Sequence, residues 1–207
     1  MGRVYAHSDL EEMAAHAGVP VINGLSDALH PCQVLADLQT INEHFGRLSG
    51  LKLCYVGDGN NMAHSLLLGC ARVGMDVAVV TPPGYEPDAG YVAKAREHAA
   101  QYGSQVLVTS DAREGVNGAH AVYTDVWASM GQKEEAAERE RIFADFQVNE
   151  ALMDSTGKDT LFMHCLPAER GREVTDGVME ADYSIVFDEA ENRMHAQNAI
   201  MVKMAGQ

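Results

Sequence analysis

This 207-residue chain has few basic residues, only four cysteines and no long apolar run. Its 15 lysines and arginines stand against 30 acidic residues, which gives a formal net charge of −15. Nucleic-acid-binding domains need a basic surface, so this balance argues against that class. No stretch approaches the roughly 18 apolar residues of a membrane helix, and the first residues lack the apolar core of a signal peptide. We therefore expect a cytoplasmic protein without a nucleic-acid or membrane partner.

The cysteines and glycines argue against two further kinds of site. No two cysteines form a CxxC pair, so we expect reduced thiols rather than a zinc site or a disulfide framework. The segment Gly57-Asp58-Gly59-Asn60-Asn61 resembles the start of a dinucleotide-binding loop, but Met62 stands where the fingerprint needs its third glycine. A tight turn with a helix N-cap, or an asparagine amide facing a ligand, remains open.

Apolar runs alternate with helical patterns from residue 51 onward. This alternation predicts an α/β fold, a doubly wound parallel sheet with helices on both faces. The expected strands are 51–56, 77–80, 106–109, 121–124, 161–163 and 184–187, and the expected helices are 62–73, 88–102, 112–116 and 133–146. Before them we expect a helix over 8–17 capped by Ser8, a strand at 19–22 and a helix over 31–45; a helix over 191–204 closes the chain.

Reactive side chains follow two of the predicted strands. Pro167 cannot donate a ladder hydrogen bond, so it ends the strand before His164-Cys165-Leu166-Pro167. Asp125 follows the strand over 121–124 and is suited to hold an ammonium group. Ligands of open α/β sheets bind at the carboxyl ends of the strands. Cys165 and Asp125 are therefore candidates for catalytic or binding roles, although Asp125 fits equally well as a loop residue that only ends the strand.

Polar groups of a second kind lie at helix starts. His30 and Gln33 begin the helix over 31–45, where free N–H groups favour an anion. Arg193 follows the last apolar run and suits phosphate or carboxylate. Each has a simpler interpretation as a cap or a solvated helix start. Their shared position predicts one cleft, with an anion site (His30, Gln33, Arg193) beside an amine site (Asn61, Asp125, Ser129) and Cys165 between them.

Together these motifs closely resemble the ornithine carbamoyltransferases of the aspartate/ornithine carbamoyltransferase family. The Ser129-Met130-Gly131 loop and Cys165 favour the ornithine branch over the aspartate branch. The matching segments occur in the family's order and span almost the whole chain: 19–25, 30–33, 57–61, 125–131, 164–167 and 189–193.

The resemblance implies transfer of a carbamoyl group from carbamoyl phosphate to the δ-amine of ornithine, giving citrulline and phosphate in arginine biosynthesis or degradation. It implies neither a metal nor an organic cofactor. By the same likeness, carbamoyl phosphate would contact His30, Gln33, Cys165, Leu166 and Arg193. Ornithine would contact Asn61, Asp125, Ser129 and Met130.

General chemistry fits these roles. A free alkylamine is protonated near pH 7, so we expect Asp125 and a Cys165 thiolate to orient the δ-amine and accept its proton. His30 would donate to the carbamoyl oxygen as negative charge develops there, and Arg193 would offset the charge of the leaving phosphate. Because the amine attacks directly, Cys165 is not expected to be a covalent nucleophile.

The family's N-terminal domain carries a Ser-Thr-Arg-Thr-Arg motif that this sequence does not contain. We therefore expect the end of a carbamoyl-phosphate domain and an interdomain helix over 1–48, an ornithine-binding domain over 49–190, and a helix over 191–207 that returns to the first domain. Members assemble as trimers, and this truncated chain is expected to be weak or inactive alone.

Two alternatives remain. One is a stand-alone amino-acid-binding module. The other is a carbamoyltransferase for putrescine or acetylornithine, and the Ser129-Met130-Gly131 loop argues against this second alternative. We also expect the apolar faces of the helices over 31–45 and 191–204 to be exposed, disordered or covered by another chain.

Overall fold

A five-stranded parallel sheet forms the centre of the computed structural model, which describes residues 1–128 and 136–206. The strand order is β5-β4-β3-β6-β7, so the chain runs outward from β3 to β5 and then returns to the other side of β3. This reversal places a topological switch point between the carboxyl ends of β3 and β6. The strands are β3 (Lys52–Val56), β4 (Asp76–Val80), β5 (Val106–Thr109), β6 (Ala121–Thr124) and β7 (Leu161–His164).

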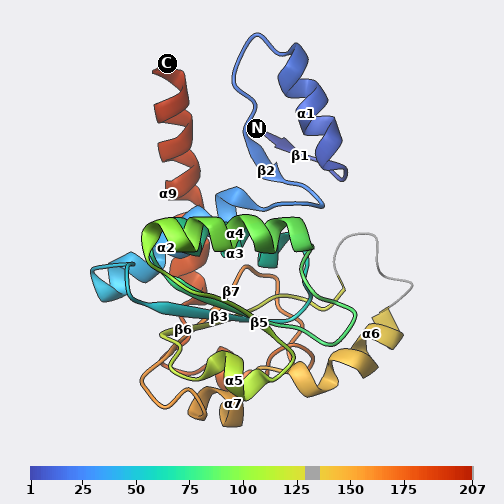
Figure 1. Ribbon diagram of the computed structural model, residues 1–207, viewed down its shortest axis with the longest axis vertical. Coiled ribbons are helices and arrows are strands. Elements are labelled where there is room, and N and C mark those ends of the chain that lie inside the picture. The colour runs from blue at the N-terminus through green and yellow to red at the C-terminus, as the bar shows by residue number, and fades with distance from the viewer. Residues whose placement is uncertain (129–135, 207) are drawn as a thin grey trace.

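Helices cover both faces of this sheet, as the alternating pattern predicts (Figure 1). One face packs against α2 (Pro31–Phe45), α3 (Asn61–Arg72) and α4 (Ala89–Tyr102). The other packs against α5 (Ala112–Val116), α7 (Glu150–Asp154) and α8 (Asp176–Met179). The doubly wound α/β fold is therefore confirmed.

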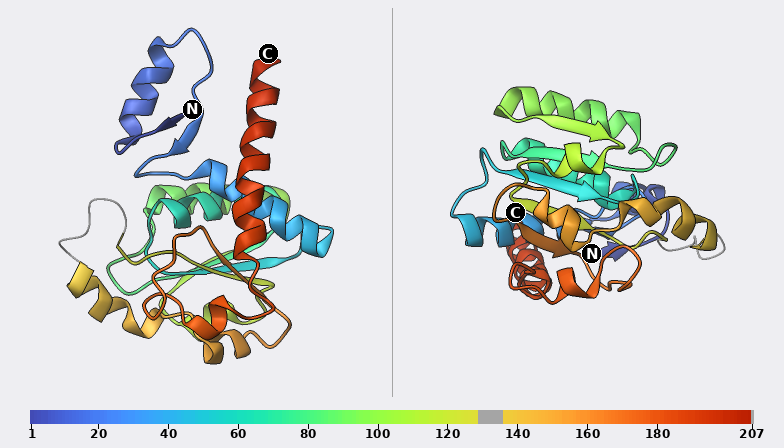
Figure 2. Two further views of the ribbon diagram at one scale, coloured as in Figure 1. Left: turned by 180° about the vertical axis from the view of Figure 1, so that it is seen from behind. Right: turned by 90° about the horizontal axis from the view of Figure 1, so that it is seen from below.

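A small N-terminal lobe and the last helix project from the same side of the sheet domain (Figures 1 and 2). In the lobe, β1 (Gly2–Arg3) pairs in parallel with β2 (Asn23–Leu25), and α1 (His7–His16) connects them. The last helix, α9 (Val186–Ala205), packs its first half against α2. None of the described helices is long and apolar enough to cross a membrane.

The predicted sixth strand over 184–187 is wrong. Ser184 forms one isolated bridge with Phe162, and α9 begins at Val186. A run of three apolar residues, Ile185 to Phe187, fits a strand or a buried helix start equally well. Here Asp188 and Glu189 occupy the first helical turn, where acidic side chains stabilise the helix dipole.

Several boundaries also differ. Helix α1 begins at His7 with Ala6 as its N-cap, so the prediction of Ser8 as the cap is wrong. The strand expected at 19–22 lies instead at Asn23–Leu25, where the pairing with β1 places it. The helix expected over 133–146 consists of α6 (Ala136–Phe143) and a 3-10 turn (Ala144–Phe146), and positions 133–135 lie outside the described residues. The sequence interpretation did not anticipate β1, α7 or α8.

The expected exposure of two apolar helix faces holds for only one helix. Val34, Leu38 and Ile41 of α2 are buried because α3 and α9 of the same chain pack over them. In the outer half of α9, by contrast, Met201 is 45% exposed and Val202 is 75% exposed. The expectation is therefore wrong for α2 and confirmed for the outer half of α9.

Candidate active site

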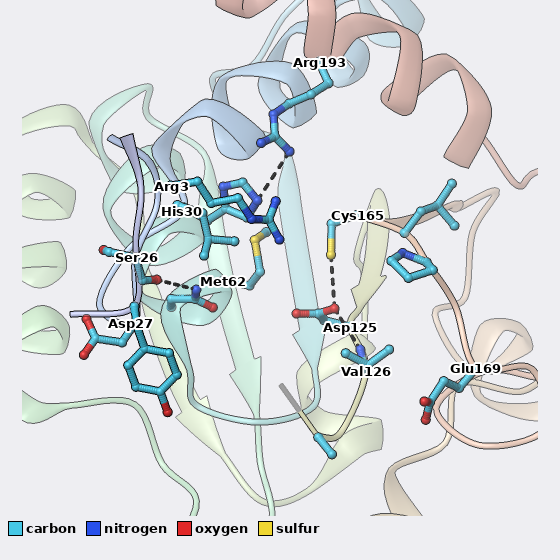
Figure 3. A pocket seen from close by; sticks show the side chains of 16 residues that line it. Arg3, Ser26, Asp27, His30, Met62, Asp125, Val126, Cys165, Glu169 and Arg193 are labelled. Carbon is cyan, nitrogen blue, oxygen red and sulfur yellow. Dashed lines mark hydrogen bonds between the residues drawn. The ribbon is translucent and has the colours of Figure 1, made fainter. Parts of the chain in front are cut away.

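A cavity of about 450 Å³ opens at the carboxyl edge of the sheet, beside the switch point between β3 and β6. The N-terminal lobe, α2, α3, the β6 and β7 tips and α9 all contribute to its wall (Figure 3). Six of the sequence-predicted residues line it: His30, Asn61, Asp125, Cys165, Leu166 and Arg193.

The other three predicted residues do not line the described cavity. Gln33 lies behind Arg193 and accepts a hydrogen bond from the Arg193 guanidinium through Oε1. Ser129 and Met130 lie outside the described residues. The structure thus brings six of the predicted residues to one cavity, and Gln33 contacts that cavity through Arg193.

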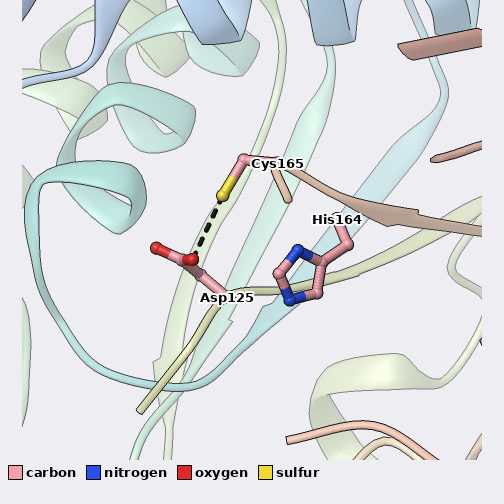
Figure 4. A group of neighbouring side chains, drawn as sticks. All are labelled: Asp125, His164 and Cys165. Carbon is pink, nitrogen blue, oxygen red and sulfur yellow. Dashed lines mark hydrogen bonds between the residues drawn. The ribbon is translucent and has the colours of Figure 1, made fainter. Parts of the chain in front are cut away.

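Asp125 and Cys165 face each other across the tips of β6 and β7 (Figure 4). The Cys165 thiol donates a hydrogen bond to Asp125 Oδ1 over 3.1 Å. Burial, together with the negative charge of Asp125, raises the pKa of the Cys165 thiol well above its ordinary value. The thiolate expected from the sequence is therefore wrong for this arrangement, because Cys165 is held as a neutral donor.

Asp125, His164 and Cys165 bring potential metal ligand atoms within 4.8 Å of one another. Both ring nitrogens of His164 are already engaged, however. Nδ1 accepts the Leu166 N–H at 2.8 Å, and Nε2 donates to Glu173 Oε1 at 3.2 Å, with both side chains fully buried. Only two ligands remain, which is fewer than zinc sites use.

The same His164 contacts shape the turn that carries Cys165. Leu166 has φ 55°, in the left-handed region, where an L-residue other than glycine costs about 1–2 kcal/mol. The hydrogen bond from its N–H to His164, which Glu173 in turn orients, holds the chain there. His164 therefore positions the Cys165–Pro167 turn and does not face the cavity as a reactive group.

His30 and Arg193 form the opposite wall. His30 Nε2 lies 3.3 Å from Arg193 Nη1, so it accepts from the guanidinium and the ring proton lies on Nδ1. His30 Nδ1 and Arg193 Nε are buried without a hydrogen-bond partner among the described residues. Burial, then the positive charges of Arg193 and Arg3, lower the pKa of His30 to about 3. His30 is therefore a neutral donor at neutral pH.

Because His30 is neutral in the folded chain, we expect the free energy of unfolding to fall in acid. Below about pH 6.5 the unfolded chain protonates position 30 and the folded chain does not, so stability falls as the pH drops toward the folded pKa of about 3. At about pH 5 this costs roughly 2 kcal/mol relative to pH 8. Urea unfolding of the wild type and His30→Asn, compared across this range, measures it. A difference between the two proteins that does not change with pH contradicts the assignment.

Arg3 is a cavity residue that the sequence interpretation missed. It lines the cavity from β1, close enough to His30 to lower its pKa. Figure 3 shows it beside His30 and opposite Asp125. A lone arginine three residues from the N-terminus gives no signal of its own, because its position depends on the pairing of β1 with β2.

The glycine-rich turn after β3 is a packed structural turn. A Cβ on Gly59 would lie 2.3 Å from the backbone nitrogen of Pro87, and Asn60 caps α3 by accepting the Met62 N–H. Arg139 of α6 forms an ion pair with Asp58 at 2.8 Å. Asn61, next in the chain, donates to the Ser26 carbonyl at 2.7 Å and lines the cavity. The segment is therefore a structural turn with a helix N-cap, and it also leaves Asn61 at the cavity wall.

Two family models match this chain. Residues 49–204 match the Asp/Orn binding domain of aspartate/ornithine carbamoyltransferase, and residues 1–43 match the carbamoyl-P binding domain. The chain belongs to the aspartate/ornithine carbamoyltransferase family.

Individual relatives agree with this membership of the carbamoyltransferase family. An ornithine carbamoyltransferase of Carboxydothermus hydrogenoformans is 55% identical over 206 residues, which cover all of this chain and 66% of the relative. The structure of the Pyrococcus furiosus ornithine carbamoyltransferase superposes with a TM-score of 0.95 at 52% identity, covering 99% of this chain and 66% of that one. An acetylornithine transcarbamylase structure reaches a TM-score of 0.85 at 35% identity, covering 96% and 63%. The chain thus spans about two thirds of the length of these relatives.

Proposed function

We propose that this chain carries the ornithine-binding part of an ornithine carbamoyltransferase and the adjoining edge of its carbamoyl phosphate site. The observation that carries the proposal is a single cavity in which Asp125 and Cys165 face His30, Arg193 and Arg3. One wall offers a carboxylate for an ammonium group, and the other offers cations and a neutral donor for an acyl phosphate. Relatives of the same family at 53–56% identity are named ornithine carbamoyltransferases, which supports the choice of amine.

On the amine side, Asp125 receives the δ-ammonium group of ornithine. Ornithine is protonated near pH 7, so its proton must leave before the nitrogen attacks. Asp125 accepts that proton, and the neutral Cys165 thiol fixes the carboxylate by donating to it. Asn61, Ser129 and Met130 are proposed to hold the amino-acid end of ornithine.

On the phosphate side, the freed amine attacks the carbamoyl carbon directly. A C–N bond forms, the C–O bond to phosphate breaks, and phosphate leaves with the electron pair. His30 donates a hydrogen bond from its protonated ring nitrogen, Nδ1, to the carbamoyl oxygen as negative charge develops there. Arg193 and Arg3 offset the charge of the departing phosphate. Cys165 and the Leu166 backbone border the carbamoyl group, and Gln33 holds Arg193 in place.

We further propose the division into residues 1–48, 49–190 and 191–207 given above, and a trimer-based assembly, as in the family. Because this chain contains no Ser-Thr-Arg-Thr-Arg motif, it carries only part of the residues that would bind the phosphate group. We expect ornithine binding to be retained and citrulline formation to be slow or absent in the chain alone.

Two measurements test this proposal. Calorimetric titration with L-ornithine should show saturable heat, with weaker binding of putrescine and N-acetylornithine. No heat at millimolar ornithine contradicts the proposal. Tighter binding of putrescine or N-acetylornithine than of ornithine would indicate that this analogue is the substrate. A citrulline assay with both substrates then separates enzyme from binding module. Turnover comparable to that of a complete relative would overturn the expected weakness of the isolated chain.

A further inference from the structure

Two carboxyl groups lie side by side in the interior behind the cavity. Asp37 of α2 and Glu189 of α9 are both fully buried and hydrogen-bonded to each other. Neither lines the cavity. The carbamoyl transfer proposed above does not need them, so their burial calls for a separate explanation.

Their neighbours place the negative charge on Glu189. Glu189 accepts three hydrogen bonds of 3.0 Å, from Gln33 Nε2, Tyr123 Oη and the His164 N–H. Asp37 accepts one, from Gln33 Nε2 at 2.9 Å, and its Oδ2 has no donor among the described residues. A carboxylate is stabilised by several donors, whereas a protonated carboxyl donates.

Two buried carboxylates in contact cannot both ionise at neutral pH, because their repulsion adds to the cost of burial. Burial is the main cause that raises the pKa of both groups, and the charge of Glu189 raises that of Asp37 further. One proton therefore belongs to the pair, and the donor count assigns it to Asp37.

The pair connects the two sides of the cavity. Gln33 Nε2 faces both carboxyl groups, so Gln33 Oε1 turns to the Arg193 guanidinium. Glu189 Oε2 holds the backbone of His164, the residue before Cys165. A shift of Glu189 would move the anion wall and the Cys165 turn together.

We propose that Asp37 and Glu189 share one proton, carried by Asp37, and act as positioning residues that hold Gln33 against Arg193 and His164 beneath Cys165. The substrates of this cavity rest on the proposed function, but the proton sharing and the positioning do not. The tests below therefore use neither ornithine nor citrulline.

Alkylation of Cys165 reports the positioning. The other three cysteines are buried and serve as internal references. Glu189→Gln replaces one carboxylate oxygen by an amide NH2, which then faces a donor, either the His164 N–H or the Gln33 and Tyr123 groups. The Cys165 turn should therefore open more often, and its alkylation by iodoacetamide should accelerate about tenfold or more. Asp37→Asn keeps a neutral donor toward Glu189 and should change the rate less than about twofold. Exposed Asp188→Asn, on the same turn of α9, is the matched control and should react like the wild type.

The contrast between the two variants decides the assignment. Equal acceleration in Asp37→Asn and Glu189→Gln overturns the proton placement, and no acceleration in either overturns the positioning role. If Glu189→Gln does not fold, Tyr123→Phe removes one donor from Glu189 and should give a smaller acceleration in the same direction; an unchanged rate then overturns the positioning role.

The stability of Asp37→Asn tests the proton without any reporter. The folded pKa of Asp37 is raised, so above the unfolded value of about 4 the folded chain retains a proton that the unfolded chain releases. Wild-type stability should therefore fall relative to Asp37→Asn as the pH rises from about 4 to 8. A constant difference overturns the proposal.

The difference between the two proteins reports the carboxyl pair, because the other groups facing the pair are present in both. Burial raises the pKa values of Tyr123, Cys70 and Cys165, which keeps these groups neutral over this range, and the substitution leaves Arg193 and His164 in place. An infrared band of a protonated carboxyl group at neutral pH, lost in Asp37→Asn, is the expected signature. Its absence from the wild type overturns the proposal.

Discussion

Asp125→Asn is expected to weaken ornithine binding by about 30-fold or more, since removing one partner of a buried charge pair costs about 2–5 kcal/mol. Asparagine keeps the shape and one carbonyl oxygen, but it offers no charge to an ammonium group. It also cannot accept the proton that the amine must lose. Calorimetric titration of the wild type and the variant with L-ornithine gives the ratio of dissociation constants.

Cys165→Ser provides the matched control for this experiment. A serine hydroxyl still donates to Asp125, as the thiol does at 3.1 Å, so binding should change far less than in Asp125→Asn. If both variants bind ornithine equally well, Asp125 does not hold the amine and the cavity takes another ligand. If Cys165→Ser has the larger effect, the thiol is the main contact.

Arg139→Met is expected to destabilise the fold by about 3–5 kcal/mol, the range for breaking a buried ion pair. The Arg139 and Asp58 side chains are only 7% and 9% exposed and lie 2.8 Å apart. Arg139 also donates to the Trp127 carbonyl and lies over the Tyr85 ring. Without it, Asp58 keeps its burial and loses the charge that opposes the rise of its pKa. Urea unfolding measures the loss.

Two further variants separate this ion pair from general effects of losing an arginine. Arg139→Met combined with Asp58→Asn removes both buried charges and should recover part of the loss. Arg170→Met removes an arginine whose ion pairs with Asp176 and Glu180 are exposed, so it should unfold at nearly the wild-type urea concentration. Equal losses in Arg139→Met and Arg170→Met would contradict a special role for the buried pair.

Periodicity predicted the sheet domain well because each element there carries its own local signals. The helix over 31–45 begins at Pro31 and stops before Gly46, which has φ 69°, so both boundaries follow from single residues. The strand over 106–109 is likewise bounded by polar residues, and the structure has it at the same positions. The run over 184–187 had no such boundary, and in the structure Ser184 forms an isolated bridge with Phe162 just before α9 begins at Val186.

The cavity was predictable wherever a residue follows a strand or starts a helix. Asp125, Cys165 and His30 are placed by the ends of β6, β7 and the start of α2, so their convergence follows from the sheet topology. Arg3 could not be found in this way, since the parallel pairing of β1 with β2 decides its position. The neutral state of Cys165 was also out of reach, because burial and the approach of Asp125 determine it.

The N-terminal lobe contributes Arg3, Tyr5 and Leu25 to the cavity, yet α1 buries only Leu10. A unit with so little buried apolar surface opens at a lower free energy than the sheet beneath it. Amide hydrogens of the lobe should therefore exchange with solvent through local unfolding. Those of β3 and β6 should exchange more slowly, through global unfolding. On the proposed function, a phosphate-bearing ligand that contacts Arg3 binds only while the lobe is folded, so its expected affinity falls with the fraction of molecules in which the lobe is open.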